Sequence, residues 1–566
     1  LLVVNFPKIF TLMIGIGLIG LGVMVIFFLL KFLFKRNKAD RSHLTEVTEA
    51  DQPELFAFIR TLTVETECHF PKKIYISPEV NASVFYDSSF WSMFLPIRKN
   101  LQIGLGLVNS VNLSEFKAIL AHEFGHFSQR SMKLGSYVYN VNQIIYNMLY
   151  DNDSYGRTLE SWANISGYFA FFANITIKIV VGIQWILQKV YAIVNKSYMA
   201  LSRQMEFHAD SVSAYVSGSQ HLITSLRRLE LADNAYNRLF GYYELWYKQS
   251  FKPDNLYPQH TAIMNQFASG QGIQVENGLP QVTAGSFAHF NKTRLVIKDQ
   301  WASHPSTEDR EKHLNRLNIR TETVKSSAWT IFRNAESLQK LVTEKIYAQV
   351  KFETAPKLLD VHSFRKLYAT EVEKYQLNSQ YKGFFDRNIS TVDLTNLQES
   401  PAERLDQVMN DEMLALPYVL EGLKIDLENL ELILQNVIPA KTFEFGGKKY
   451  ERAETATLIS QVKEELSAAK NNLVKADAEV VAFFIKAARK HAQVDRLKER
   501  YNELFQVSVT AEEDLEKYSQ VMADINPIYY NNLSYTDINV IMAKVKNNEM
   551  AIRDRLRELS HESSSA

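Results

Sequence analysis

The stretch at residues 122–126 reads His-Glu-Phe-Gly-His, and it constrains this chain more than any other stretch. In a helix, His122 and His126 lie on one face, one turn apart. Two imidazoles in that arrangement can bind one Zn²⁺, and Glu123 can reach a metal-bound water as a general base. The pattern therefore predicts a helix that carries two metal ligands and a catalytic base.

The flanking residues predict the helix itself. Asn112 can cap the first turn, and Glu115, three residues later, completes a capping box. We expect the helix to run from residue 112 to about residue 130. The alternative, a surface helix with two solvated histidines, is disfavoured by the apolar residues around the motif: Leu113, Phe116, Ile119, Leu120, Phe124 and Phe127.

An acidic pair farther along the chain offers a third ligand. Glu206 and Asp210 lie one turn apart if residues 203–210 are helical. Zinc hydrolases commonly use His, His and Glu and leave the fourth position to water, which suits Glu206. Asp210 can then accept a hydrogen bond from the free ring nitrogen of a ligand histidine. His208 is the rival ligand, but it lies about 160° round the helix from Glu206, so we favour Glu206.

Composition limits the other classes of function. The 566 residues are enough for three or four domain-sized units, and a formal net charge of zero argues against a nucleic-acid binder. Cys68 is the single cysteine, which excludes an internal disulfide and a cysteine-based zinc site. The sequence shows no phosphate-binding glycine loop, no nucleotide fingerprint and no catalytic serine or cysteine arrangement.

An uncharged stretch near the start of the chain predicts a transmembrane helix. Residues 9–30 contain no charged side chain and are long enough to cross a bilayer core. A signal sequence is disfavoured by this length and by the lack of a small-residue cleavage site. Glycines recur at spacings that suit packing against another membrane helix: Gly15, Gly17, Gly20 and Gly22.

The charges on either side of this stretch predict its orientation. Lys8 alone precedes it, whereas a basic group follows: Lys31, Lys35, Arg36, Lys38 and Arg41. The positive-inside rule then places the following domain in the cytoplasm. The chain opens on Leu1 rather than Met, so we expect that the numbering starts inside a longer precursor or that a segment has been removed.

A small sheet and a helical hairpin are expected around the metal helix. Residues 45–68 have a helical pattern, and strand-like segments follow at residues 73–76, 82–86 and 101–105, the last running into the metal helix. An edge strand of such a sheet can hold an extended peptide by main-chain hydrogen bonds. The hairpin is assigned to residues 133–200, with a turn at residues 151–156. It either enters the membrane or lies as an amphipathic pair on the surface of the domain or of the bilayer.

Together these motifs resemble those of the HtpX-like and CAAX-prenyl-endopeptidase-like membrane zinc metallopeptidases. That family pairs His-Glu-x-x-His with a later Glu-x-x-x-Asp, as residues 122–126 and 206–210 do here. Asn81-Ala82 resembles the Asn-Ala of its substrate-side edge strand, and Ser303-His304-Pro305-Ser306 with Arg310 resembles its His-Pro element. The resemblance covers residues 45–317, although Ser306 stands where the family often has a second Pro.

The resemblance implies a gluzincin-type peptidase domain in an integral protein of the cell (inner) membrane, with substrate bound near Asn81 and Ala82. It implies that His304 and Arg310 border the active site, with His304 stabilising the oxyanion. It further implies peptide or protein substrates, membrane proteins among them, and a role in membrane-protein quality control. Processing of prenylated peptides is less favoured, since the multi-helix membrane chamber of that branch is not visible in the sequence.

Beyond residue 320 the resemblance ends. Residues 378–399 are loop-rich, the chain is helical from residue 401, and residues 441–450 predict a β-hairpin with a Gly-Gly turn. We favour a helical hairpin that packs on itself over a dimerising coiled coil, which leaves self-association through these helices as the alternative. The pattern behind both is a heptad-like seam: Leu458, Val462, Leu466, Ala469, Leu473, Ala476, Val480, Phe483, Ala487, Val494, Leu497, Tyr501 and Leu504.

The sequence therefore predicts a mainly α fold with a small β-sheet, a small β-hairpin and a long heptad-patterned helix. We expect a membrane-anchored zinc metalloendopeptidase that binds one Zn²⁺ per chain through His122, His126 and Glu206. Its parts are a transmembrane segment with a basic flank, a zinc metallopeptidase domain, a connecting region and a helical C-terminal domain: residues 1–38, 39–320, 321–400 and 401–566.

Two other interpretations fit the motifs less well. A non-catalytic, membrane-tethered scaffold could keep a zinc-bound fold and bind partners through its C-terminal helices. It would have four protein ligands and no need for Glu123. An intramembrane zinc protease would have a wholly apolar zinc helix, whereas this one carries Glu115, Lys117 and Arg130.

Overall fold

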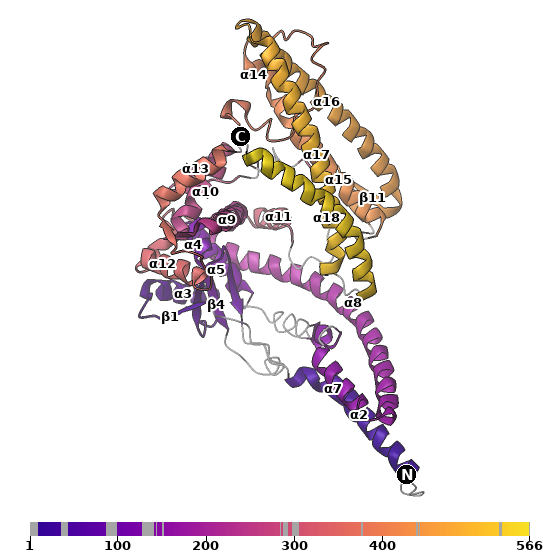
Figure 1. Ribbon diagram of the computed structural model, residues 1–566. Coiled ribbons are helices and arrows are strands. Elements are labelled where there is room, and N and C mark those ends of the chain that lie inside the picture. The colour runs from indigo at the N-terminus through magenta and orange to yellow at the C-terminus, as the bar shows by residue number, and fades with distance from the viewer. Residues whose placement is uncertain are drawn as a thin grey trace. The chain divides into compact units, whose positions relative to one another are not determined.

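Helices make up most of the structure, and small sheets accompany them (Figure 1). The chain divides into two compact units, which we name unit 1 (Leu1–Ser286 and Asp299–Ala369) and unit 2 (Phe287–Lys298 and Thr370–Ala566). The expectation of a mainly α fold with small sheets is confirmed, whereas the four-part division of the chain stays a prediction. The computed structural model describes residues 9–34, 44–85, 99–126, 141–142, 144–149, 152–283, 285–286, 292–296, 305–374, 377–436, 438, 440, 442–530 and 535–564.

Among the described residues of unit 1, two helices are long and apolar enough to cross a membrane. They are α2 (Ile9–Phe34), with the candidate span Thr11–Leu30, and α8 (Gly167–Ser217), with the candidate span Gly167–Tyr191. α2 contacts α8, and a Cβ added at Gly17 of α2 would overlap the ring of Phe172 on α8. The absence of a side chain at this glycine therefore allows the apolar helices to approach closely.

Within the described residues, the helical hairpin is interrupted near Asn152 and again at residues 164–166. Residues 153–163 form α7 (Asp153–Ala163), and α8 begins after Ser166, whose hydroxyl accepts a hydrogen bond from the Phe169 amide. Residues 144–149 are helical and Asn152 is not, so the expected turn at residues 151–156 is confirmed at Asn152 and wrong for residues 153–156, which form the first turn of α7. Residues 133–140 of the assigned hairpin lie outside the described residues.

The sheet beside the metal helix has four strands in the order β1-β2-β4-β3, with β2 and β4 parallel and the other pairs antiparallel. The three expected strands are confirmed within one or two residues. The sequence did not predict the first strand, whose residues were expected to be helical. A segment of three residues is too short to show alternation, and this strand depends on pairing with β2. The strands are β1 (Thr45–Val47), β2 (Ile74–Ser77), β3 (Ala82–Phe85) and β4 (Asn100–Gly104).

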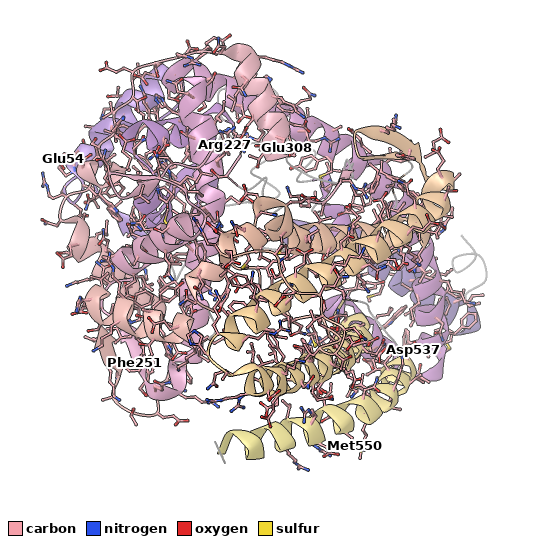
Figure 2. The ribbon with its side chains drawn as sticks, turned by 90° about the horizontal axis from the view of Figure 1, so that it is seen from above. Glu54, Arg227, Phe251, Glu308, Asp537 and Met550 are labelled. Atoms are coloured by element: carbon pink, nitrogen blue, oxygen red, sulfur yellow. The ribbon has the colours of Figure 1, made fainter. Side chains whose placement is uncertain are left out.

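The core of unit 1 lies between this sheet and the helices α3 (Pro53–Glu65) and α5 (Leu113–Gly125), whose apolar side chains form one buried cluster. A short helix, α4 (Leu105–Ser110), separates β4 from α5, so the strand does not run directly into the metal helix. Helices α9 and α11 lie side by side where Figure 2 labels Arg227 and Glu308. The other helices and strands of unit 1 are α9 (Ser219–Leu245), β5 (Phe251–Pro253), α10 (Leu256–Gly270), β6 (Val275–Glu276), β7 (Leu279–Pro280), α11 (Thr307–Leu317), α12 (Ala335–Tyr347), β9 (Lys357–Leu359) and most of α13 (Val361–Glu373), whose last residues belong to unit 2.

Unit 2 consists of long helices and one small sheet. Helix α15 (Asp411–Leu434) packs on α16 (Thr455–Arg489), and α17 (Val494–Tyr530) contacts α18 (Tyr535–Ser564), while α14 (Leu405–Val408) is a single turn. The heptad-like seam is split between α16 and α17 by the break at residues 490–493, and its coiled-coil interpretation stays a prediction.

The expected β-hairpin is present in unit 2. It is formed by β10 (Thr442–Phe445) and β11 (Lys448–Glu451), and its turn holds Gly446 and Gly447 at φ 57° and 79°. A left-handed backbone at two consecutive positions explains the Gly-Gly pair. A strand from much earlier in the chain, β8 (Leu295–Val296), pairs with β10, which no local pattern could predict.

Candidate metal centre

Helix α5 presents two histidines at its C-terminal end. The Asn112 side chain accepts a hydrogen bond from the Glu115 amide at 2.9 Å, and the Glu115 carboxylate accepts one from the Asn112 amide at 3.0 Å, which confirms the capping box. The cap defines where the helix begins and so which side chains face the core. His122 is buried and His126 is half-buried, and their Nε2 atoms lie 3.2 Å apart.

A buried ion pair anchors the opposite end of α5. The Glu115 carboxylate also accepts a hydrogen bond from Arg228 of α9, and both side chains are only 2% exposed. Arg228 donates a further hydrogen bond to the Pro280 carbonyl at 2.7 Å. No sequence pattern predicted this pair, since Arg228 belongs to no motif and lies 113 residues from Glu115.

Helix α8 crosses close to α5 and brings the acidic motif to the histidines. A Cβ added at Gly125 would lie 2.9 Å from the Cα of Ala209, so the two backbones meet where neither residue has a bulky side chain. The Ser213 hydroxyl of α8 donates to the Ala118 carbonyl of α5 at 2.7 Å. This close approach places Glu206 beside the histidine pair, although the two motifs are far apart in sequence.

The three side chains named from the sequence as metal ligands converge. Glu206 Oε2 lies 3.5 Å from His122 Nε2, and Glu206 Oε1 lies 3.3 Å from His126 Nε2. One donor atom from each of these residues lies within 4.8 Å of the others. Donors about 2.1 Å from one tetrahedral Zn²⁺ are separated by about 3.4 Å. The observed separations therefore fit a His-His-Glu zinc site.

Asp210 lies behind His122 and is completely buried. Its Oδ1 is 2.9 Å from His122 Nδ1, and Arg310 of α11 donates to Oδ1 from Nη2 at 2.6 Å and to Oδ2 from Nε at 3.0 Å. The helix that carries Arg310 begins after Ser306, whose hydroxyl accepts a hydrogen bond from the Asp309 amide. Asp210 thus receives hydrogen bonds from a histidine and from a bidentate guanidinium group.

These contacts determine the protonation of the two histidines. Burial alone would lower the pKa of His122, but hydrogen bonds to Asp210 and Glu206 raise it to about 9. Burial and the neighbouring His122 lower the pKa of His126 to about 4. Burial opposes ionisation of Asp210, yet hydrogen bonds from His122 and Arg310 lower its pKa. At neutral pH the His122 imidazole is therefore protonated, and a bound metal would displace one of its protons, whereas the His126 imidazole is neutral.

Glu123 and His208 are placed differently from the ligand set. Glu123 is half-buried on α5. Burial and the hydrogen bonds to Asp210 and Glu206 have the largest effects on the pKa of His122, and burial and Asp210 have the largest effects on the pKa of Arg310. The charge of the Glu123 carboxylate adds a smaller contribution that raises the pKa of both groups. His208 is exposed on α8, whereas Glu206, two residues earlier, is buried. Within the described part of the chain, the group of side chains that could hold a metal ion contains Glu206 and not His208.

Strand β3 lies at the edge of the sheet, beside α5. Asn81, just before it, is exposed, and its carbonyl accepts a hydrogen bond from the Gly104 amide at 2.8 Å. A Cβ at Gly104 would collide with the Glu79 and Asn81 carbonyls, so only glycine lets this loop approach. Ala82 is buried in the core. The remaining named residue, His304, lies outside the described residues.

The comparisons with known proteins cover the part of the chain that carries this centre. Residues 69–318 match the family model of peptidase family M48. A protease HtpX homolog from Campylobacter curvus is 24% identical over 301 residues, which are 53% of this chain and 85% of the relative. Protease HtpX from Idiomarina loihiensis is 29% identical over 160 residues, and that from Vibrio atlanticus is 26% identical over 168 residues.

These relatives differ in how much of their own length is matched. The Idiomarina and Vibrio matches each cover 28% of this chain and 50% and 51% of the relatives, so the chain spans about half the length of those two proteins. Among solved structures, Ste24p of S. mikatae has a TM-score of 0.24 at 14% identity, over 56% of this chain and 60% of that one. A similarity this low supports no conclusion about the fold.

Proposed function

We propose that this chain is a membrane-anchored zinc metalloendopeptidase, since residues 69–318 match the family model of peptidase family M48. The observation that carries the proposal is the spacing of the His122, His126 and Glu206 donor atoms, which suits one tetrahedral Zn²⁺. When bound, Zn²⁺ supplies Lewis-acid activation of water and of the scissile carbonyl. The three side chains would hold one ion per chain and leave a fourth position open.

Glu123 is proposed as the general base. It would accept the proton from the attacking water and later pass that proton to the leaving amine. Asp210 would orient His122 by accepting a hydrogen bond from its Nδ1, and Arg310 would balance the buried carboxylate. His304 stays a proposed oxyanion donor.

Strand β3 is proposed to hold the substrate. It is an edge strand beside the metal helix, so an extended peptide can add to it through main-chain hydrogen bonds. This mode of binding recognises the backbone of an unfolded segment and demands little of its side chains. Unfolded peptide and protein segments, those of membrane proteins included, are therefore the proposed substrates, and quality control of membrane proteins is the proposed role.

The membrane orientation is also a proposal. Helix α8 continues without a break from the candidate span Gly167–Tyr191 to Glu206, so the metal centre lies on the side of the bilayer that the end of this helix reaches. The basic residues after α2 assign that side to the cytoplasm of a cell (inner) membrane. A cysteine introduced just after Arg41, in a chain with Cys68 replaced by Ser, should resist an impermeant thiol reagent in intact cells. Labelling from outside would contradict the orientation.

The decisive experiment separates the base from the ligands. Glu123→Gln keeps the size of the side chain and removes its basicity, so the variant should bind stoichiometric Zn²⁺ and lose casein hydrolysis by roughly 10²–10⁴-fold or more. Glu230→Gln, at an exposed position on α9, is the matched control and should retain wild-type rates. If Glu123→Gln cleaves at the wild-type rate while fully metallated, the chain is not a peptidase of this kind and the scaffold interpretation moves ahead.

A further inference from the structure

A cavity of about 610 Å³, which we name the groove, lies in unit 2, between helix α16 and the loop at residues 391–402. Its volume is in the range of sites that bind ligands in other proteins, about 300–1,000 Å³. None of the residues of the metal centre belongs to unit 2. The cavity is therefore a separate feature, which the peptidase mechanism does not use.

The helical wall of the cavity is apolar and carries small side chains. Val474, Ala478 and Ala482 recur every four residues on α16 and line one face of the groove, and Val474 is 40% exposed. These positions extend over about 12 Å along the helix, which is the length of three or four residues of an extended peptide. The wall thus offers room for small apolar side chains without a deep pocket for a large one.

The opposite wall is a loop whose backbone is available for hydrogen bonding. Its Val392 and Leu394 are buried in the core of unit 2, which holds the loop in place. The backbone amide and carbonyl groups of residues 397–399 make no hydrogen bond to any other described residue. Backbone groups along a groove that lack an internal partner are those to which an added extended segment can bond.

The charges around the groove favour a basic ligand. Three carboxylates line it, from Asp393, Glu399 and Glu479, against one ammonium group, from Lys475. Glu399 pairs with Arg489, whereas Glu479 forms no ion pair within the described part of unit 2. An exposed carboxylate beside an apolar wall can pair with a lysine or arginine side chain of a bound peptide.

We propose that this groove binds an extended segment of another polypeptide that has a basic side chain next to small apolar ones. The segment would bond to the backbone of residues 397–399, place its apolar side chains against Val474 and Ala478, and pair its basic side chain with Glu479. The inference goes beyond the proposed peptidase activity and does not depend on it, because no residue of the metal centre takes part.

The test is fluorescence anisotropy with the full chain carrying Glu123→Gln, so that the probe is not cut. The probe is a fluorescein-labelled peptide, Lys-Val-Thr-Lys-Val-Thr-Val, and the matched peptide has Glu in place of each Lys. The Lys peptide should bind, and the Glu peptide should bind at least about threefold more weakly. Adding Glu479→Lys should weaken the Lys peptide by about three- to fivefold, and adding Val474→Trp should weaken it more by filling the groove.

Glu464→Lys is the control, since it makes the same charge change at an exposed position of α16 outside the groove, and it should leave binding unchanged. Should Val474→Trp lower the melting temperature, the exposed Glu479→Lys still decides the matter. Equal affinity of Glu479→Lys and Glu464→Lys for the Lys peptide would overturn the proposal. The proposal would also be overturned if a second copy of the chain occupied the groove. In that case the Lys peptide would not bind, and the chain would sediment as a dimer that Val474→Trp dissociates. Because hydrolysis is not measured, failure of the peptidase proposal would leave this result intact.

Discussion

Replacing Asp210 by Asn tests whether the buried carboxylate orients His122, a proposed metal ligand. The carboxylate bonds to His122 Nδ1 at 2.9 Å and to Arg310 at 2.6 and 3.0 Å. An amide in its place has one acceptor oxygen. If that oxygen stays beside His122, the amide nitrogen faces Arg310 Nε, so two donors meet and the guanidinium group loses its counter-charge.

The size of the effect follows from burial. Asp210 is 0% exposed and the Arg310 side chain is 13% exposed, so Asn leaves a largely buried cation without a partner. Breaking a buried ion pair in this way costs about 3–5 kcal/mol, which corresponds to a fall in melting temperature of roughly 6–20 °C. Loss of the orienting group should weaken Zn²⁺ binding by about 10- to 100-fold.

The assay is chelator competition for Zn²⁺ beside thermal melting of the same detergent-solubilised preparations. Asp210→Asn combined with Arg310→Met removes the unpaired cation, so stability should largely return, while the asparagine oxygen can still accept from His122 and recover part of the affinity. Asp233→Asn, exposed on α9, is the matched control. If Asp210→Asn keeps Zn²⁺ affinity within about twofold and melts like the wild type, Asp210 does not orient His122 and the reasoning fails.

Three further predictions follow from the same structure. His122→Ala should abolish stoichiometric Zn²⁺ binding, as measured by metal analysis, and retention of one Zn²⁺ would contradict the ligand assignment. Gly125→Ala should place a methyl group against Ala209, force α5 from α8, lower stability by about 1–3 kcal/mol and weaken Zn²⁺ binding; an unchanged melting temperature would show that the helices adjust freely. The third prediction concerns His260, which is buried and lies far along the chain from the proposed metal ligands. Burial lowers the pKa of His260 to about 4. Because the unfolded chain takes up a proton near pH 6.5 and the folded chain does not, the free energy of unfolding should fall by roughly 3 kcal/mol as pH drops from 7 to 4. His260→Gln should remove this part of the pH dependence of the melting temperature.

Local patterns were sufficient for several elements. The capping box at Asn112 and Glu115, the strands around Ile76 and Ile103, and the Gly-Gly hairpin depend on neighbours in sequence, and all are present. The pattern failed where a segment was too short or ambiguous. Strand β1 exists only through its pairing with β2, and the polar residues after Asn152 begin a helix although they resemble a turn.

At the candidate site, too, the sequence predicted local features and the tertiary structure decided which residues meet. The sequence by itself determined which residues have metal-binding chemistry, because helical periodicity places His122 and His126 on one face and sets Glu206 apart from His208. Only the tertiary structure decided that these groups meet, since the Gly125–Ala209 contact between α5 and α8 brings Glu206 within 3.5 Å of a histidine. It also supplied the buried Glu115–Arg228 pair and the Arg310 guanidinium behind Asp210. Periodicity acts over a few residues, whereas the distance between two helices depends on the packing of every side chain between them.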